Sequence, residues 1–481
     1  MKQVTLSFDR TAKPRYLAIA EALRQAIRQG VLVAGEVLPS ARALAEQCAC
    51  HRHTIMAAYN ELVAEGWIVG KERSAYRIID TLPDHFFAAQ QQAKSAEQPA
   101  MDFAFARQIE TADLISQDSF THRFQSGLPD LRCFPKTEFK SCWSDAFKHP
   151  FEHLLGYSDC AGHALLRQEI ATYLRRVRSV VDRDILITHG SQEAIFMVGQ
   201  LLLKAGDHVA VEALGYPPAW EALRASGAKL IGIPVDQQGL DIDALAKQLK
   251  KGTIKLIYTT PLHQYPTTVT LPIDRRLALY DLAAQYQVPI LEDDYDHEFH
   301  YRSQPLAPLA AHDPCGLVIY ASTFSKVLYP SARCGFMALP KKLFGPLVDM
   351  KRIISRQNDT LLQLAIALWM QEGGLDRHMR KMRRVYEARR DAMAEALSCY
   401  AVDWHLPDGG MAIWVDCRQD TQQLADHARR NHVYVMPETQ FRLDGQLGTH
   451  LRLGFANQTP EEIALGLSRI MRLQPQLLEQ H

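Results

Sequence analysis

A lysine flanked by hydroxyl residues stands in Thr323 to Phe336, TFSKVLYPSARCGF, and an arginine follows it seven positions later. A lysine in such a setting is commonly a solvated surface side chain. The alternative is covalent chemistry, in which Lys326 forms a Schiff base with an aldehyde compound. Thr323, Ser325 and Arg333 would then bind a phosphate group of that compound. The stretch by itself leaves both interpretations open.

Carboxylates and a phenol follow an apolar run in VPILEDDYDHEFH. Asp293 can pair with a pyridine nitrogen and keep it protonated, and Tyr295, two residues later, can bond a ring hydroxyl. The alternative is a metal site built from these acids with His297 and His300. Because HEFH is one residue short of the HExxH pattern, we favour an organic cofactor over a metal.

Small residues precede an apolar helical pattern in HGSQEA. The backbone amides of Gly190, Ser191 and Gln192 could meet a phosphate at the start of a helix, and an ordinary helix cap is the alternative. Ser191 lacks the flanking glycines of a nucleophile elbow, so a nucleophilic serine is not indicated.

Two further side chains stand where a ligand could meet them. Tyr216, in LGYPPAW, could stack on a planar ring or be a plain turn residue. Arg452, in HLRLGFA, has apolar neighbours and could face outward or pair internally. If it faces inward, its guanidinium fork suits a carboxylate ligand.

Short apolar runs alternate with helical patterns through the larger part of the chain. The strand-like runs are HVAVEAL, KLIYTTP, VPILEDDYD, LVIYAST and CGFMALP. This alternation predicts an α/β fold with a largely parallel sheet covered by helices. Because ligands bind outside the carboxyl ends of strands in such sheets, we expect the polar residues that end these runs to converge.

The order of these motifs resembles the fold-type I, pyridoxal-phosphate-dependent aminotransferases over about residues 120–481. The resemblance implies a mostly parallel central sheet with a smaller α+β C-terminal subdomain. It makes Lys326 the Schiff-base lysine, with Asp293 and Tyr295 on the ring nitrogen and the ring hydroxyl. The remaining assignments are Tyr216 on the ring, Gly190, Ser191, Gln192, Thr323, Ser325 and Arg333 on the phosphate, and Arg452 on a ligand carboxylate. Tyr157, in GYSDCAGHALLR, resembles the tyrosine that such enzymes lend to the neighbour's phosphate, which implies a homodimer.

The first 80 residues have a different pattern. Residues 14–68 contain three helical patterns, with breaks at GVLVAGEVLPS and CACHRH. Leu17 and Ile19 start one apolar stripe, and Leu62 and Val63 end another. A short helix, a tight turn and an amphipathic helix predict a helix-turn-helix, followed by the hairpin-like VGKERSAYRI.

This part resembles the winged helix-turn-helix of the GntR regulators, whose LPS-x-R and EG signatures match Leu38 to Arg42 and Glu65-Gly66. Joined to an aminotransferase-like region, it is similar to the MocR subfamily. FQSGLPD, HQYPT, EDDYDHEF and TFSKVLYP match that subfamily's recurrent stretches. The resemblance places DNA contacts at Arg42, Arg52, His53 and Thr54, each of which is otherwise a solvated helix residue.

Residues 1–80 depart from the GntR pattern in two places. Cys50-His51-Arg52 stands where a serine cap is usual before the recognition helix, and Ser74 and Ala75 replace wing glycines. A zinc site at the cysteines and histidines is not favoured, because these ligands crowd into one turn and no second cluster completes a tetrahedron. The four side chains concerned are Cys48, Cys50, His51 and His53.

The composition bounds the remaining possibilities. Lys plus Arg and Asp plus Glu number 54 each in 481 residues, which argues against a wholly basic nucleic-acid coat. Residues 1–80 hold 11 basic and 8 acidic residues, so a nucleic-acid site is expected there. We predict a DNA-binding domain at 1–80, a linker at 81–115 and an effector domain at 116–481. The nine cysteines have no framework spacing, and no signal or membrane segment is evident, so we expect a soluble, cytoplasmic protein with reduced thiols.

Two functions remain in competition. The first is a transcriptional regulator that binds double-stranded operator DNA and senses pyridoxal phosphate, or an amine or amino acid, through its aminotransferase-like domain. The second is a working aminotransferase with an accessory DNA-binding module. We favour regulation over turnover, because a retained helix-turn-helix makes sense mainly if DNA is the output. The effector, the operator and the sign of regulation do not follow from the sequence.

Overall fold

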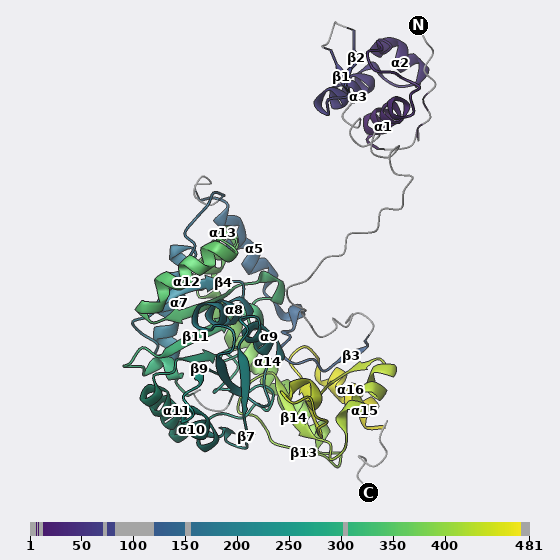
Figure 1. The fold of residues 1–481 in the computed structure, drawn as a ribbon. Helices are drawn as coiled ribbons and strands as arrows, with labels where there is room; N and C mark the ends of the chain where they lie inside the picture. The colour runs from purple at the N-terminus through teal and green to yellow at the C-terminus, as the bar shows by residue number, and fades with distance from the viewer. Residues whose placement is uncertain are drawn as a thin grey trace, which may run out of the picture. The chain divides into compact units, whose positions relative to one another are not determined.

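The structure is a computed structural model that describes Leu6, Phe8 and residues 13–70, 75–81, 120–149, 155–301 and 306–472. The chain forms two compact units, Met1–Glu110 and Thr111–His481 (Figure 1). The predicted linker, residues 81–115, lies outside the described residues apart from Thr81. Among the residues that are described, no helix is both long and apolar enough to cross a membrane.

The first unit is a three-helix core with a two-stranded sheet. Its elements are α1 (Arg15–Arg28), α2 (Ala41–Gln47), α3 (Arg52–Ala64), β1 (Ile68–Val69) and β2 (Arg77–Ile78). The two strands pair antiparallel, as expected for a wing, and the wing residues 71–74 lie outside the described residues. The predicted helices, breaks and hairpin arms are therefore confirmed.

Two apolar residues expected in the helix stripes of this unit are exposed. Leu17 stands two residues before buried Ile19, which places it about 200° around α1 and on the solvent side. Val63 follows buried Leu62 and lies at the edge of the α3 stripe, where it is also exposed. The prediction of a core position was wrong for both.

The LPS signature has a structural role in this unit. Leu38 is buried, and Ser40 caps α2 by accepting a hydrogen bond from the Ala43 amide at 3.2 Å. The hydroxyl of buried Tyr59, on α3, donates to the Pro39 carbonyl at 2.8 Å. The signature thus fixes the start of α2 against α3.

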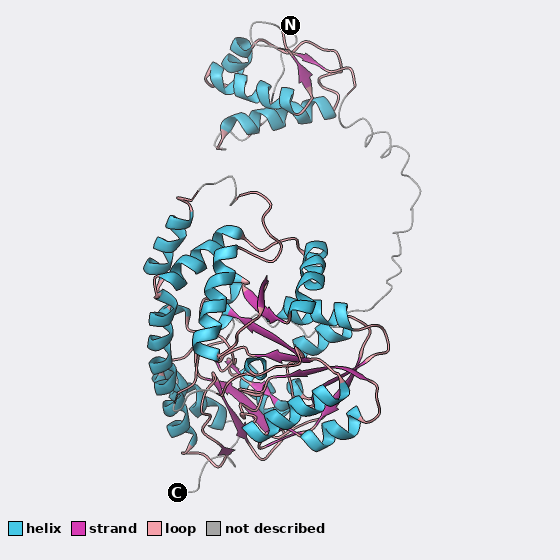
Figure 2. Ribbon diagram, turned by 90° about the vertical axis from the view of Figure 1, so that its left-hand side faces the viewer, coloured by secondary structure: helices cyan, strands magenta, loops and turns pink. Residues whose placement is uncertain are grey.

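The second unit is built on a seven-stranded sheet between helices (Figure 2). The strand order is β4-β12-β11-β10-β9-β5-β6, and only β12 runs antiparallel to its neighbours. The strands are β4 (Asp184–Thr188), β5 (His208–Glu212), β6 (Lys229–Ile233), β9 (Ile254–Thr259), β10 (Ile290–Asp293), β11 (Val318–Thr323) and β12 (Gly335–Leu339). The largely parallel sheet and the five predicted strands are confirmed.

Helices cover both faces of this sheet. One face packs on α8 (Ser191–Leu202), α9 (Pro217–Arg224) and α12 (Lys341–Ile354). The other packs on α7 (Ala164–Arg178), α10 (Ile242–Leu249), α11 (Ile273–Tyr286), α13 (Thr360–Gln371) and α5 (Lys136–Ala146). Successive residues of a strand alternate between the faces, so Ile290 belongs to one core cluster and Leu291 to the other.

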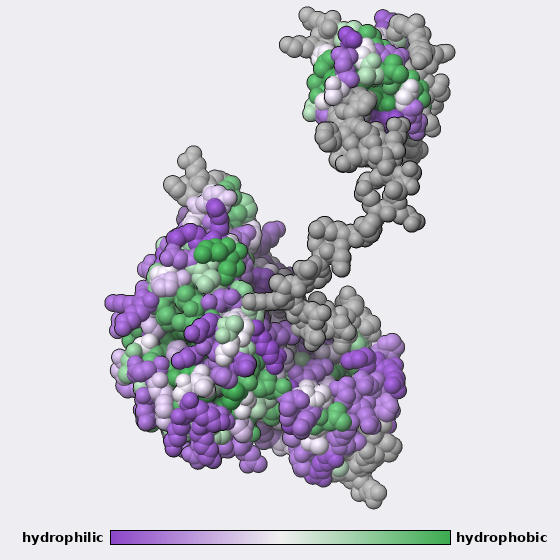
Figure 3. Space-filling model, viewed as in Figure 1, coloured by the Kyte–Doolittle hydropathy of each residue, from purple (hydrophilic) through white to green (hydrophobic). Residues whose placement is uncertain are grey.

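The predicted C-terminal α+β subdomain is present. Its four-stranded antiparallel sheet has the order β13-β14-β17-β16. Its elements are β13 (Asp403–Trp404), β14 (Ala412–Asp416), β16 (Met436–Pro437), β17 (His450–Gly454), α15 (Thr421–Arg430) and α16 (Pro460–Arg472). The 24-residue helix α14 (Gly374–Leu397) precedes it in the chain. In the face shown in Figure 3, hydrophilic side chains predominate over this subdomain.

Short strands complete the fold. They are β3 (His122–Arg123), which pairs parallel with β15 (Val433–Tyr434), and the antiparallel pair of β7 (Val235–Asp236) and β8 (Gly239–Leu240). The β3 pairing joins the start of this unit to its C-terminal subdomain.

Candidate cofactor site

The residues expected to do chemistry follow the carboxyl ends of strands in one sheet. Strand β10 ends at Asp293 and β11 at Thr323, and the two strands are parallel neighbours in which Asp293 pairs with Ala321. Strands β4 and β5 end just before Gly190 and Tyr216. Since parallel strands end at one edge, these residues gather as the sequence predicted.

Lys326 lies in a short 3-10 helix, Phe324–Lys326, that follows β11 directly. The Thr323 hydroxyl caps this turn by accepting from the Ser325 amide at 3.2 Å. The Lys326 ammonium donates to the Gly127 carbonyl at 2.8 Å. A Cβ on Gly127, which has φ +74°, would approach the Lys326 Nζ to 2.8 Å. The glycine of FQSGLPD therefore makes room for this lysine.

The surroundings of Lys326 favour a reactive amine. Burial lowers the pKa of Lys326, while the nearby charges of Asp296 and Asp293 oppose that shift. A lysine with a lowered pKa is more often neutral and can act as a nucleophile. This environment differs from the solvated lysine that the sequence left as an alternative.

Asp293 carries a carboxylate oxygen with no partner among the described residues. The side chain is buried, and its Oδ2 accepts from the Tyr258 hydroxyl at 3.0 Å, whereas Oδ1 has no hydrogen bond. Burial, followed by the charge of Asp294, raises the pKa of Asp293 to about 7. A buried polar atom without a partner indicates a missing ligand or water, and a protonated ring nitrogen would satisfy it.

Tyr295 lies beside the same space. Its hydroxyl donates to the His263 carbonyl at 2.9 Å, and burial raises its pKa far above the usual value. The phenol therefore stays protonated and can donate a hydrogen bond. The His263 ring in turn contacts Asp296, with 2.7 Å between Nδ1 and Oδ1.

The structure brings Gly190 and Arg333 together at the start of α8. A Cβ on Gly190, which has φ +87°, would come within 3.1 Å of the Arg333 guanidinium. That guanidinium donates to the His189 carbonyl at 2.5 Å. The amides of the helix start and this cation form a site suited to a phosphate. Thr323 and Ser325 lie together, with 2.9 Å between their hydroxyl oxygens.

Gln192 has a second contact that the sequence did not reveal. Its side-chain amide donates to the Pro218 carbonyl at 2.6 Å, which ties α8 to α9.

Gly335 is a site residue that sequence reasoning missed. A Cβ there would lie 2.7 Å from the Gly190 Cα and 2.8 Å from the Ser322 carbonyl, so only glycine lets β12 pass this close. The sequence feature that could have indicated Gly335 is its position at the start of an apolar strand, just after Arg333-Cys334.

Arg452 faces inward, which excludes the outward-facing alternative, and it has internal partners. Its side chain is 1% exposed on β17 and donates to the Pro266 carbonyl. The guanidinium carbon lies 4.3 Å from the centre of the Tyr265 ring, and the Tyr265 ring is 5.1 Å from that of Tyr216. Tyr265 was not predicted, although it stands between the residues of HQYPT that matched the resemblance.

Tyr157 stands apart from these contacts in the single chain. Its side chain is 84% exposed, and the Arg356 guanidinium lies 4.9 Å from the centre of its ring. The segments around both residues are joined, since the Gln357 amide donates to the Gly156 carbonyl and accepts from the Ser158 amide. Exposed Leu155 and Ile353 belong to the same two segments.

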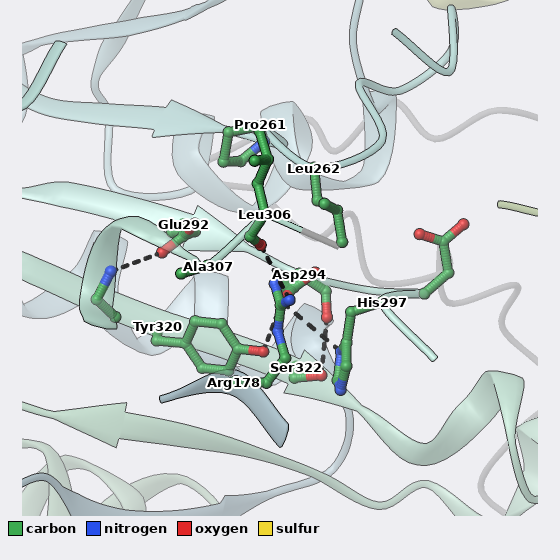
Figure 4. A network of polar contacts seen from close by, with 12 residues as sticks. Arg178, Pro261, Leu262, Glu292, Asp294, His297, Leu306, Ala307, Tyr320 and Ser322 are labelled. Carbon is green, nitrogen blue, oxygen red and sulfur yellow. Dashed lines mark hydrogen bonds and ion pairs between the residues drawn. The ribbon is translucent and has the colours of Figure 1, made fainter. Parts of the chain in front are cut away.

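A buried network supports the end of β10 from the opposite face (Figure 4). Arg178 forms an ion pair with Asp294 at 2.7 Å, and the Tyr320 hydroxyl donates to the same carboxylate at 2.6 Å. Burial would raise the pKa of Asp294, but the Arg178 charge and the hydrogen bonds hold it at about 2. His297 contacts Asp294 at 3.7 Å and also belongs to this network.

The alternative metal site is not formed by the residues that the structure describes, which contain no group of three suitable ligands. His297 is used in the Asp294 network, and its Nε2 lies 3.0 Å from the Tyr173 hydroxyl. His300 instead stacks on His263, with ring centres 5.7 Å apart.

The expected DNA contacts lie in the first unit, at two helix starts. Arg42 is exposed on α2, with Glu46 3.5 Å away, and Arg52 and His53 are exposed in the first turn of α3, where Thr54 is half-buried. His51 replaces the usual serine and still caps α3, because its Nδ1 accepts from the His53 amide at 3.3 Å.

Fold and site together define an aminotransferase-like unit carried by a chain with a winged helix-turn-helix. Residues 136–470 match the family described as aminotransferase class I and II, and residues 15–78 match the bacterial regulatory proteins of the gntR family. The match to the aminotransferase family spans more than half of the chain, so the second unit belongs to that family.

Relatives with a regulatory name match most or nearly all of this chain. A probable rhizopine catabolism regulatory protein MocR of Rhizobium meliloti is 30% identical, covering 83% of this chain and 80% of the relative. The regulator TauR of Rhodobacter capsulatus is 28% identical over 95% of this chain and 96% of its own. Among solved structures, a Pyrococcus horikoshii kynurenine aminotransferase has TM-score 0.70 at 30% identity, over 73% of this chain and 91% of its own. This chain belongs to the MocR subfamily of the GntR regulators.

Proposed function

We propose that this protein is a DNA-binding transcriptional regulator that binds pyridoxal phosphate and senses the cofactor itself, or an amine or amino acid, in its second unit. The observation that carries the proposal is the presence, in one chain, of a GntR-type module and a half-buried lysine on which the charge of Asp293 acts, while Asp293 keeps one oxygen without a hydrogen bond. The GntR-type module would bind the DNA, and the site around Lys326 would bind the ligand that regulates this binding.

The residues of the site fit pyridoxal phosphate. When bound, the cofactor supplies an aldehyde carbon that an amine can attack and a pyridine ring that withdraws electrons. Lys326 would hold the aldehyde carbon, and the free Oδ1 of Asp293 would hold the proton of the ring nitrogen. The Tyr295 phenol would turn its single O–H from the His263 carbonyl to the ring hydroxyl. The phosphate would be held by Gly190, Ser191, Gln192, Thr323, Ser325 and Arg333, with Tyr216 on the ring.

The effector that fits best is a small molecule with a primary amine and one carboxylate. Arg452 is buried and presents a guanidinium fork to the ring space, which suits a carboxylate. An amine that displaced Lys326 would free that side chain, and the ligand would favour the arrangement of the protein that binds it better. A shift of this kind would change the affinity for operator DNA.

A homodimer is part of the proposal. Exposed apolar side chains at Leu155, Tyr157 and Ile353 lie on two joined segments, and such a patch is typical of an interface. In a dimer, Tyr157 would complete the neighbour's phosphate site, and paired helix-turn-helix modules would read two half-sites on DNA.

The first experiment is borohydride reduction of the protein with added pyridoxal phosphate, followed by peptide mapping. We expect a stable adduct on Lys326, and we expect Lys326→Ala to lose the visible absorbance band and the response of DNA affinity to the cofactor. Lys342→Ala, which removes an exposed lysine, is the control and should keep both.

A second substitution tests the DNA output separately. Arg52→Ala should weaken DNA binding and leave the absorbance band intact, because Arg52 lies in the other unit. An adduct absent from Lys326 would remove the cofactor part of the proposal, and unchanged DNA affinity of Arg52→Ala would remove that contact.

The second candidate function, a working aminotransferase, is favoured by the inward Arg452 and the lowered pKa of Lys326. It predicts formation of a 2-oxo acid from an amino acid at about 1 s⁻¹ or faster, the lower end of ordinary enzyme rates. Measuring 2-oxo acid formation from a panel of amino acids with the cofactor-loaded protein distinguishes the two functions. A pure sensor would bind an amino acid without such turnover.

A further inference from the structure

The first half of α14 carries an unusual concentration of positive charge. Between Arg377 and Arg384 there are five basic residues and no acidic residue, in a chain whose formal charges cancel. The exposed members, Arg377, Arg380, Lys381 and Arg384, line a surface hollow of about 350 Å³. We name these four residues the α14 basic surface. Their spacing of three, four and seven residues puts them on one helix face over about two turns.

Most other arginines of α14 have structural partners. Arg383 donates to the Glu298 carbonyl at 2.6 Å, Arg389 pairs with Asp130 at 2.7 Å, and Arg390 pairs with Asp391 at 2.8 Å. In contrast, no acidic side chain pairs with Arg380, Lys381 or Arg384 among the described residues, while Arg377 is paired with Glu138 at 2.6 Å. Packing and ion pairs therefore do not account for the three unpaired cations.

Two further observations extend the positive field. Arg176 pairs with Asp376 at 2.8 Å, which joins the basic last turn of α7, including exposed Arg175, to the start of α14. Burial, followed by the charge of Lys381, lowers the pKa of His378 to about 4. The charge of Glu138, which is paired with Arg377, opposes this shift of the His378 pKa.

We propose that the α14 basic surface binds the phosphate backbone of double-stranded DNA, as a contact additional to the helix-turn-helix. The inference rests on the proposed function, in which this chain binds DNA. Duplex DNA carries one negative charge per about 1.7 Å of helix axis, so several phosphates lie within the length of this surface. Arginine forks bind phosphate, and such contacts add affinity without sequence preference.

The salt dependence of DNA binding tests the proposal. The full-length protein and a triple variant, Arg380→Gln/Lys381→Gln/Arg384→Gln, are titrated by fluorescence anisotropy against a random-sequence duplex of about 60 base pairs at several salt concentrations. Each lost phosphate contact lowers the slope of log affinity against log salt by about 1. We expect the triple variant to have a slope smaller by about 3 and weaker binding at low salt.

A matched control removes the same charge elsewhere. Lys247→Gln/Lys250→Gln/Lys251→Gln takes three exposed cations from α10 and its C-terminal end and should keep the wild-type slope. The cofactor absorbance and the thermal transition of each variant establish that its second unit is folded.

The outcomes separate this inference from the proposed function. An unchanged slope in the triple variant overturns the inference, as it would if the surface served an acidic protein instead of DNA. An equal loss in the α10 control also overturns it, because the effect would then be one of net charge. A wild-type protein with no salt-dependent DNA binding would overturn the proposed function as well.

Discussion

At the scale of single residues, neighbouring acids of one short stretch have opposite roles. Asp293 and Asp294 are adjacent, so their side chains leave the end of β10 on opposite faces. Both acids keep Oδ1 without a hydrogen bond, but Asp294 is paired in charge with Arg178 and also accepts from Tyr320. Asp293 meets only the neutral Tyr258 hydroxyl, and its charge acts on Lys326, so its free Oδ1 is the one available to the cofactor. The chemistry of the site depends on that free oxygen.

The raised pKa of Asp293 makes the cofactor-free protein sensitive to pH. Its folded pKa is about 7, against about 3.9 for an unfolded aspartate. A folded pKa above the unfolded value contributes stability that is complete below about pH 4 and is lost as the pH rises through about 7. We expect Asp293→Asn to remove the share of this dependence that comes from Asp293, as measured by urea denaturation midpoints between pH 4.5 and 8. Burial also raises the pKa of Glu292 to about 7 and that of Glu298 to about 8, so their share remains.

The same substitution should lower the affinity of the protein for pyridoxal phosphate. Loss of a hydrogen bond to a charged group costs about 1.5–3 kcal/mol, or about 10- to 100-fold in Kd. Absorbance titration with pyridoxal phosphate measures it. Equal pH profiles for Asp293→Asn and wild type, with equal affinity, would show that this carboxylate does not face the ring.

At the scale of elements, α7 shows how burial decides the worth of an ion pair. Arg176 and Arg178 stand in the same last turn, and both pair with an aspartate at 2.7–2.8 Å. The Arg176 pair is exposed, while both partners of the Arg178 pair are at most 2% exposed. Only the second anchors the strand end that carries Asp293.

We therefore expect very different costs for two parallel substitutions in this helix. Arg178→Met leaves Asp294 charged and buried without its partner and should destabilise the second unit by about 3–5 kcal/mol. Arg176→Met should cost about 1 kcal/mol or less, because an exposed pair is solvated and screened. Urea denaturation followed by tryptophan fluorescence compares them, and similar midpoints for the two variants would contradict the assigned role of the network.

At the scale of the whole molecule, the proposed dimer explains why the Tyr157 side chain is exposed in the single chain. In the single chain its ring is almost fully exposed and contacts Arg356. A large aromatic left in water at the joined segments is explained if a second copy covers it. The phosphate site would then be complete only in the assembly.

A mixed dimer tests this arrangement. Tyr157→Ala alone should bind pyridoxal phosphate about 10- to 100-fold more weakly, and Lys326→Ala alone should form no adduct. When differently tagged variants are combined, the Lys326→Ala chain lends its Tyr157 to the other, so one native site per mixed dimer should return. Borohydride adducts quantified on the Tyr157→Ala chain measure it. No recovery in the mixture would show that Tyr157 acts within its own chain or has no role.

The sequence by itself determined the features that depend on neighbouring residues. The order of the strands along the chain, the polar residues at their ends, the helix-turn-helix and the start of α8 follow from local patterns and turn chemistry. These signals placed Lys326, Asp293 and Arg333 at successive junctions and carried the resemblance that family comparison then confirmed.

Only the tertiary structure decided what depends on distant residues. The inward direction of Arg452, the stacking of Tyr265 against it and the close pass of Gly335 beside Gly190 each join segments far apart in the chain. The same holds for the unpaired cations of α14, since a charge pattern in sequence does not say which charges find partners. The physical reason is that burial, dielectric and charge neutralisation are set by packing, which local periodicity does not specify.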